Sequence, residues 1–172
     1  RMALTKVIGS GIGQVTDIKI GGSGSANTLN DYEEGTFSVT VQDAASGGNS
    51  NAMAGAGDAD GVYTKIGDIV FYSIAGAVNT SGLTGGNDIF FHGLPFTANN
   101  KTNFYEGTIP RIVGTGIDLD NNYTTVTTTV GESTSTVRVF QQGDAQTSKT
   151  VQVNLFTDDT QIRMQGMYHT DS

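Results

Sequence analysis

The sequence predicts an all-β protein, an antiparallel β-sandwich or jelly roll with an extended N-terminal lead. No long window repeats apolar residues at the i, i+3, i+4, i+7 spacing of an amphipathic helix. Instead, several short segments alternate apolar and polar residues, and turn-forming residues separate them; the 172 residues include 24 glycines. About eight or nine short strands with regular turn signals are typical of a sandwich or jelly roll.

The first 30 residues differ in composition from the remainder. They are rich in glycine and carry few large apolar side chains, which is typical of an extended lead or linker. We therefore predict two parts, a Gly-rich attachment lead over residues 1–30 and a β-sandwich domain over residues 31–172.

The first half of the domain holds four predicted strands and one predicted mobile loop. Residues 36–41 alternate as TFSVTV, and residues 69–78 form a run long enough for a fully buried strand. Residues 43–60 are rich in Gly, Ala, Asn and Asp with Met53 as their one large apolar residue, which predicts a mobile loop. The two further strands are expected at residues 88–92 and 108–113.

The second half has the clearest alternation in the chain. Val151, Val153 and Leu155 fall on one face of a predicted strand, with Gln152 and Asn154 on the other, as expected where one face meets a core and the other meets water. The strands predicted here are rich in β-branched residues. They cover residues 124–130, 134–140, 150–156 and 161–168.

Composition excludes or disfavours several classes of protein. The chain lacks cysteine, which excludes disulfide scaffolds, iron–sulfur clusters and cysteine nucleophiles. Its net charge of −8 disfavours nucleic-acid binding through phosphate neutralisation. The longest apolar run, residues 69–78, is shorter than the ~20 residues of a membrane-spanning helix, and residues 1–13 contain no signal-peptide core.

The titratable residues predict neither a catalytic centre nor a metal site. His92 lies within a predicted strand and His169 near the end of the chain, and neither has a catalytic motif around it. We expect a bonded ring nitrogen for His92 and solvent exposure for His169. The acidic run at residues 31–34 favours a solvated charge cluster that protects the first strand from edge pairing.

Two acidic loops place oxygen ligands at alternate positions, as calcium loops do. Asp58 and Asp60 form one such pair, and Asp118 and Asp120 the other. Neither continues to a bidentate glutamate at the twelfth position. Turns stabilised by aspartate side chains are therefore the favoured interpretation, and no cofactor is expected.

Four segments, taken together, resemble a module of tailed-phage virion proteins, especially fibre and tail or head appendage proteins. The chain departs from the family pattern at Phe37, where tryptophan is usual, and at Asn30, which replaces an aspartate. Residues 2–13, MALTKVIGSGIG, also look like the start of such proteins. The four segments are NTLNDYEEGTF (27–37), GVYTKIGDIV (61–70), GLPFTA (93–98) and the ending GMYHTDS (166–172).

The resemblance implies a non-enzymatic structural protein of a phage virion. Its expected form is a fibre or spike module displayed on the particle for adsorption to the host surface, and its expected state is a homotrimer in contact with other virion proteins. The alternative is a capsid decoration or head-fibre protein. A surface-polysaccharide depolymerase is less favoured, because the sequence shows no constellation of carboxylates. Neither nucleic-acid binding nor membrane insertion is expected.

Two groups of residues are candidates for contacts. Residues 101–106 form a polar loop with adjacent aromatics, so an exposed tyrosine beside Lys and Asn could meet a glycan or protein of the host; a strand edge with one partly buried ring is the favoured alternative. The candidate receptor contacts are Lys101, Asn103 and Tyr105. The candidate virion attachment residues are Leu4, Val7, Ile8 and Ile12 of the lead.

Overall fold

The fold is known from a computed structural model, which confirms an all-β, antiparallel sandwich. It describes residues 18–19, 28–29, 31–55, 60–100, 105–113, 116–157 and 160–171. No helix in these described ranges is long and apolar enough to cross a membrane.

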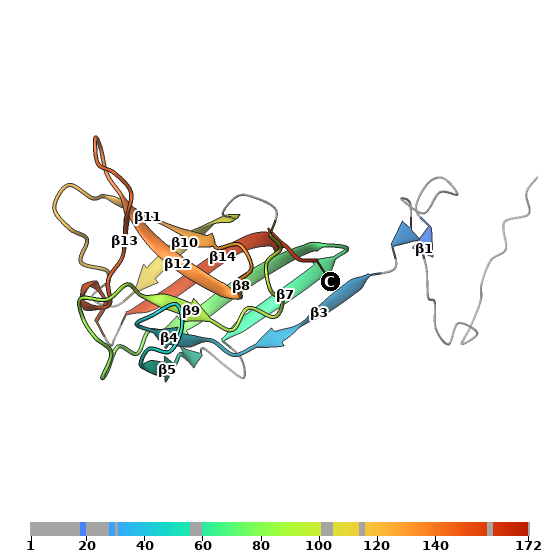
Figure 1. The fold of residues 1–172 in the computed structure, drawn as a ribbon, viewed down its shortest axis with the longest axis horizontal. Helices are drawn as coiled ribbons and strands as arrows, with labels where there is room; N and C mark the ends of the chain where they lie inside the picture. The colour runs from blue at the N-terminus through green and yellow to red at the C-terminus, as the bar shows by residue number, and fades with distance from the viewer. Residues whose placement is uncertain are drawn as a thin grey trace, which may run out of the picture.

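Ten strands follow one another across a single twelve-stranded antiparallel sheet in the order β3-β7-β8-β14-β10-β11-β12-β9-β4-β5. Two short strands complete it, because β13 pairs with β12 and β6 pairs with β8. The sheet folds over on itself into two layers (Figure 1). We call β3, β7, β8 and β14 the first layer, and β11, β12, β9 and β4 the second layer. The first layer comprises β3 (Tyr32–Phe37), β7 (Gly61–Ile66), β8 (Ile69–Ala77) and β14 (Gln161–His169).

The remaining elements connect or complete the layers. The second layer comprises β4 (Thr40–Gln42), β9 (Phe90–His92), β11 (Thr125–Val130) and β12 (Thr136–Gln142). The other elements of the sandwich are β5 (Ser50–Ala52), β6 (Ala54–Gly55), β10 (Tyr105–Val113), β13 (Lys149–Thr150) and the 3-10 turn η2 (Val153–Leu155). In the lead, β1 (Ile18–Lys19) and β2 (Thr28–Leu29) form a separate antiparallel pair, and the other residues of the lead lie outside the described ranges.

The chain crosses between the layers within one of the predicted strands. Residues 36–41 do not form a single strand, because β3 pairs with β7 and β4 pairs with β9. The break falls at Ser38 and Val39, where the Val39 N–H donates to Asp60 Oδ2 at 2.8 Å. One alternating stretch of sequence therefore supplies strands to both layers.

The predicted mobile loop at residues 43–60 contains a second crossing. β5 pairs with β4 of the second layer, and β6 pairs with β8 of the first. Between them Met53 is only 4% exposed and belongs to the core. The mobile-loop prediction is therefore wrong for residues 50–55. The single large apolar residue of this stretch was the signal that part of it would be ordered.

The core lies between the layers and is lined by alternate residues of each strand. On β8, Val70, Tyr72 and Ile74 are buried, whereas Phe71 between them is 46% exposed. The prediction of a fully buried strand at residues 69–78 is therefore wrong, and β8 is buried on one side only. The second layer contributes Val137, Val139 and Phe91, among others, to the same cluster.

The segment predicted as a strand at residues 150–156 has the expected burial but a different backbone. Val151, Val153 and Leu155 are buried, yet β13 ends at Thr150 and a 3-10 turn follows. The backbone N–H groups of Val153 and Asn154 donate to loop carbonyls rather than to a neighbouring strand. The other predicted strands are confirmed within a few residues of their ends, and β10 begins earlier, at Tyr105.

The connections between the strands collect at two ends of the sandwich (Figure 1). We call the end at which β3 starts and β14 finishes the terminal end, and the opposite end the loop end. Besides these strand ends, the terminal end holds the β7–β8 turn and residues 93–99 and 131–135. The loop end holds residues 43–49, 78–88, 116–124 and 143–148.

Candidate functional site

The four segments that resemble the virion module come together at the terminal end. β3 pairs with β7 along its whole length, from Tyr32 opposite Ile66 to Phe37 opposite Gly61. β7 and β8 form a tight hairpin, in which Gly67 has a φ of 61°, a left-handed conformation that glycine adopts without strain. The third and fourth segments pack against this hairpin through their aromatic side chains.

Phe96 is the centre of the cluster. Its ring meets that of Tyr63 edge to face, with centroids 5.5 Å apart, and the Lys65 ammonium lies 5.5 Å from its centroid. The Phe96 N–H donates to Tyr168 Oη at 3.2 Å, and the Tyr168 hydroxyl donates to the Phe96 carbonyl at 3.0 Å. Burial raises the pKa of Tyr168 well above its ordinary value. Phe96 is partly buried and packs against the core.

Most of the acidic run lies inside a strand, since β3 begins at Tyr32 directly after Asp31, and its carboxylates have partners. Asp31 pairs with Lys65, whose side chain is 3% exposed. Glu33 accepts the Tyr63 hydroxyl, and Glu34 accepts the Tyr32 hydroxyl at 2.8 Å. These hydrogen bonds to carboxylates raise the pKa of both tyrosines. The acidic run therefore holds β3 against β7, and it also places negative charge along the edge of the sheet.

The last strand closes the terminal end. His169 Nδ1 lies 3.0 Å from Asp68 Oδ2, and the Asn99 N–H donates to the His169 carbonyl at 2.7 Å. The Thr170 N–H donates to the Asp68 carbonyl at 2.8 Å. The His169 side chain is 37% exposed, in agreement with the predicted solvent exposure, and its ring in addition has a carboxylate partner. His92 has the expected bonded ring, with Nδ1 3.2 Å from the Thr136 hydroxyl.

The outer side of the second layer carries a hollow of about 440 Å³, which we call the polar hollow. The Arg138 guanidinium lies over the Phe90 ring, 4.9 Å from its centroid, because β12 and β9 place these residues opposite each other. Glu132, Thr134 and Thr136 complete its wall. A guanidinium, a carboxylate and hydroxyls beside an aromatic ring match the donors and acceptors of a polar ligand such as a sugar.

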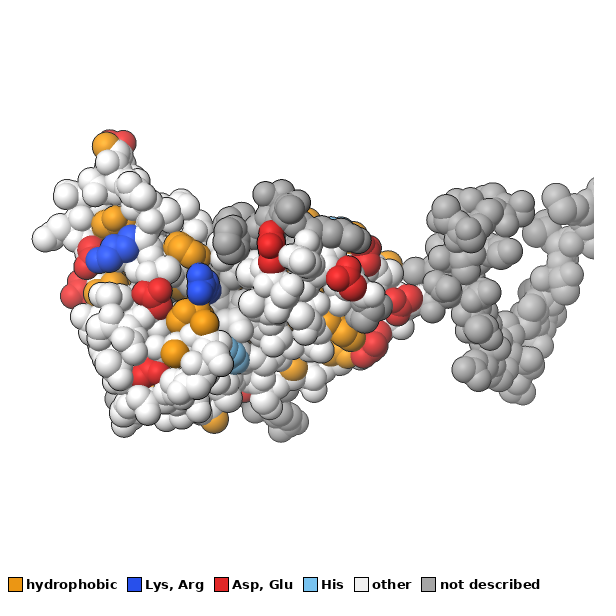
Figure 2. Space-filling view, in the orientation of Figure 1, with side chains coloured by type: hydrophobic (Ala, Val, Ile, Leu, Met, Phe, Trp, Pro, Cys, Tyr) orange, Lys and Arg blue, Asp and Glu red, His pale blue; other side chains and the backbone are white. Residues whose placement is uncertain are grey.

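Charge is distributed unevenly over this side of the molecule. Figure 2 shows both basic and acidic side chains over the half that holds β12 and β13, whereas only acidic charged side chains are seen at the end where β3 starts. In the polar hollow itself the guanidinium of Arg138 is accompanied by the carboxylate of Glu132.

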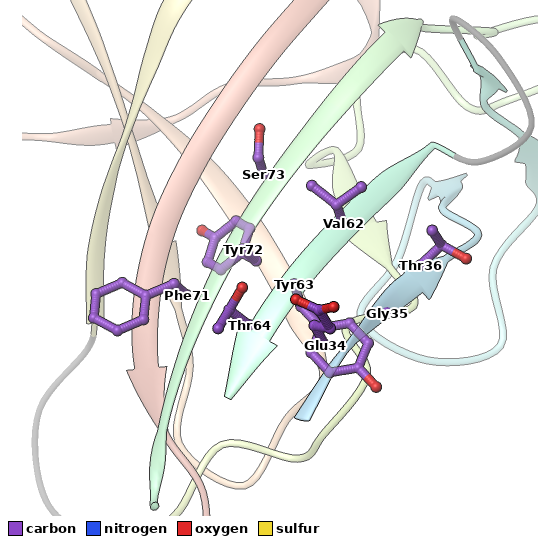
Figure 3. A pocket seen from close by; sticks show the side chains of 9 residues that line it. All are labelled: Glu34, Gly35, Thr36, Val62, Tyr63, Thr64, Phe71, Tyr72 and Ser73. Atoms are coloured by element: carbon purple, nitrogen blue, oxygen red, sulfur yellow. The ribbon is translucent and has the colours of Figure 1, made fainter. Parts of the chain in front are cut away.

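A second hollow, of about 600 Å³, lies on the outer side of the first layer. Figure 3 shows Val62 and Thr64 of β7 and Phe71 and Ser73 of β8 around it, together with Glu34 and Thr36 of β3. It is a shallow depression on a sheet, and its side chains are mainly apolar or uncharged.

The loop end is held by polar contacts. Asp43, which is 3% exposed, accepts hydrogen bonds from the backbone N–H groups of Asn49 and Thr84, each at 2.8 Å. Hydrogen bonds from Thr84 and Asn49 lower the pKa of Asp43. Asp120 pairs with Lys149 and accepts the Gln141 side-chain amide at 2.9 Å, and the pKa of Asp120 is lowered by Lys149 and then by Gln141.

Two aspartates of the acidic loops, Asp60 and Asp120, have protein partners for their side chains. Asp60 accepts the Val39 N–H, and the Tyr123 N–H donates to the Asp120 carbonyl in a turn. Asp58 lies outside the described residues. Among the residues that the structure describes, no three His, Asp or Glu side chains are grouped so as to hold a metal ion.

Most residues proposed for contacts lie beyond what the structure describes. Leu4, Val7, Ile8 and Ile12 of the lead do so, and so do Lys101 and Asn103. Tyr105 is the first residue of β10, opposite Val130. It therefore stands next to Gly131, which lines the polar hollow.

Sequence reasoning missed the polar hollow. Phe90 and Arg138 are 48 positions apart, and only the pairing of β9 with β12 brings them together, so no local pattern indicated the site. The alternating positions Val62, Thr64 and Ile66 on β7 did indicate that the outer side of the first layer is largely apolar. No family model matches the chain, and no curated protein matches it either.

Proposed function

We propose that this chain is a non-enzymatic structural protein of a phage virion, displayed on the particle as a homotrimeric fibre or spike module for adsorption to the host. One observation carries the proposal. Segments resembling the virion module are far apart in the sequence, yet they interlock at the terminal end through Phe96, Tyr168 and Lys65. This convergence supports the proposal, because the four segments form one connected unit of the fold.

The arrangement suits a displayed module. Residue 31, at which the lead joins the sandwich, and residue 171 lie at the terminal end, so attachment through the lead leaves the loop end pointing away from the particle. The polar hollow on the side of the sandwich offers Arg138, Glu132 and Thr136 to a glycan of the host surface. In this proposal, the lead makes the contacts with other virion proteins.

The test is to locate the chain on intact particles by cryo-electron microscopy. The proposal expects its density on a tail fibre or spike, with the terminal end towards the particle. Density spread over the capsid shell would favour the alternative, a capsid decoration or head-fibre protein. Absence of the chain from purified particles would overturn a virion role.

A further inference from the structure

The strongest hydrogen-bond donor in the polar hollow is the guanidinium of Arg138. Arg138 lies opposite Phe90, and its guanidinium lies over the Phe90 ring. Because Phe90 is only 5% exposed, its ring supports the guanidinium and offers little surface of its own to a ligand. With the described residues, Arg138 forms this ring contact but no hydrogen bond and no ion pair. Its planar fork of N–H donors is therefore available to a ligand.

The two threonines of the polar hollow present oxygen acceptors. The Thr134 hydroxyl donates to the Gly131 carbonyl at 2.8 Å, so its hydrogen is already used. Thr136 Oγ1 lies 3.2 Å from His92 Nδ1, and His92 Nε2 lies 3.3 Å from the Ala44 carbonyl oxygen. A carbonyl can only accept, so in the neutral ring Nε2 carries the hydrogen and Nδ1 accepts the Thr136 hydroxyl. Both threonine oxygens therefore keep lone pairs for the donors of a ligand.

The loop at residues 43–49 closes one side of the polar hollow, because it doubles back across the outer side of β9. Thr40 of β4 already lies opposite His92, yet the loop that follows β4 returns Ala44 to the His92 ring. Ala45, the next residue, lines the hollow. The small side chain at this position leaves the space beside Arg138 open.

Strand pairing cannot hold a peptide at the polar hollow. β12 pairs with β11 and β9, and β9 pairs with β12 and β4. Extended peptides bind sheets by pairing with a free edge, and both strands beneath the hollow already have a neighbour on each side. A ligand must therefore be bound through the side chains of the wall.

Charge in the polar hollow favours an uncharged ligand with many hydroxyl groups. The Glu132 carboxylate stands in the same wall as the Arg138 guanidinium, and the other lining residues are uncharged. The net charge of −8 adds to the repulsion of an anionic ligand. A sugar hydroxyl can donate and accept at once, so a sugar matches one donor group surrounded by acceptors. The volume of about 440 Å³ is within the range of small-ligand sites.

We propose that the polar hollow binds a neutral sugar unit of a host glycan. Oxygens of the sugar accept hydrogen bonds from the Arg138 guanidinium, and its hydroxyls donate to the carboxylate of Glu132 and to the two threonine oxygens. The proposal rests on the adsorption role of the proposed function, and it names the class of sugar and the groups that bind it.

The first experiment is binding of the labelled full chain to an array of neutral and acidic oligosaccharides. The wild type should bind neutral members and leave acidic ones unbound. Calorimetric titration with the neutral oligosaccharide that gives the strongest array signal then compares the variants. Each variant is also melted, so that a loss of binding can be separated from a loss of fold.

Arg138 should have the largest effect on binding. Arg138→Met keeps an apolar stem over Phe90 but removes the donors, and should weaken binding about tenfold or more, the effect expected from losing hydrogen bonds to a charged group. Arg138→Lys keeps the charge without the planar fork, and should also weaken binding severalfold. Lys149→Met is the matched control, because it removes one positive charge at an exposed position outside the hollow. It should change binding less than about twofold.

Two further variants test the wall. Ala45→Trp fills the polar hollow and should abolish binding, whereas Gln146→Trp, at an exposed position of another loop, should bind like the wild type. Glu132→Gln keeps the shape of the wall but removes its negative charge, so it should gain binding to acidic members of the array.

Three results would overturn the inference. Binding of the wild type to acidic oligosaccharides alone would contradict a neutral sugar, and binding that persists in folded Arg138→Met and Ala45→Trp would contradict this location. No binding to any member of the array would contradict a sugar site. Each of these results leaves the virion role standing, because the presence of the chain in purified particles tests that role separately.

Discussion

The two ends of the sandwich are held together by different kinds of contact. At the terminal end, interlocked aromatic rings, a buried lysine and a tyrosine bonded twice to one backbone residue join four distant segments. At the loop end, carboxylates such as Asp43 and Asp120 tie loops together by hydrogen bonds and an exposed ion pair. Aromatic packing fixes one arrangement, whereas loops held by a few polar contacts can vary without unfolding the sheet. The terminal end is therefore suited to a constant attachment, and the loop end to a variable contact.

The largest effect should come from removing the central ring of the terminal end. Phe96→Ala should lower the free energy of unfolding by about 2–4 kcal/mol, because a partly buried aromatic side chain is lost together with its contacts to Tyr63 and Lys65. Leu83→Ala is the matched control, since Leu83 is also partly buried against the core but lies at the loop end. Urea denaturation measures both. If Leu83→Ala lowered the free energy of unfolding as much as Phe96→Ala or more, aromatic packing at the terminal end would not be the stronger contribution to stability.

A smaller loss should follow from deleting one hydroxyl. Tyr168→Phe leaves the N–H and carbonyl of Phe96 without their partner, which should cost about 1–2 kcal/mol. Tyr72→Phe is the control: burial raises the pKa of Tyr72 to about 12 and the Thr128 hydroxyl beside it acts in the opposite direction, but neither hydroxyl makes a well-formed hydrogen bond in the described ranges. The control should change stability by less than about 0.5 kcal/mol. A comparable loss in both variants would show that the bonds to Phe96 contribute little.

At the loop end the effect should depend on pH. The pKa of Asp43 is lowered in the folded protein, so its contribution to stability is present above the ordinary aspartate pKa of about 3.9 and is lost as pH falls below it. Asp43→Asn should lower the melting temperature at neutral pH and flatten its decline in acid. Asp144→Asn, at an exposed position of the same end, should leave the wild-type profile unchanged. If the melting temperature of Asp43→Asn fell in acid as steeply as that of the wild type, protonation of Asp43 would not be the cause of the decline.

Removing the lead should have the smallest effect on stability. A chain starting at Asn30 keeps Asp31, its ion pair with Lys65 and the whole core cluster, so its melting temperature should be close to that of the full chain. It should fail to enter particles if the lead attaches the protein. Melting curves and particle composition give the two readouts. A truncated chain that still assembles would assign attachment to the sandwich.

The sequence predicted the class of fold and most strands, because alternation with period two directly reflects which side chains face a core. The prediction failed where a segment has the burial pattern of a strand but not the backbone conformation of one. Val151, Val153 and Leu155 alternate and are buried, yet a 3-10 turn carries two of them. It failed again at Ser38 and Val39, because nothing local distinguishes a continuous strand from one that changes layers.

The candidate site was less predictable than the fold. The four segments of the resemblance could be named from the sequence, but their meeting around Phe96 depends on contacts across 72 positions, such as that with Tyr168. Phe71 was placed in the core, since a long apolar run does not reveal that one side of β8 faces outwards. Such features follow from strand pairing rather than from any local pattern.

The central claim is that the terminal end attaches to the particle and the loop end is displayed. It is tested most directly by inserting a short epitope either in the loop at residues 143–148 or directly after Asp171 at the terminal end, and measuring antibody binding to free protein and to intact particles. Both epitopes should bind antibody on the free protein, because each insertion site includes exposed residues. On particles, the antibody should bind the loop-end epitope and should bind the terminal-end epitope little or not at all. Equal binding to both, or binding to the terminal-end epitope alone, would contradict it.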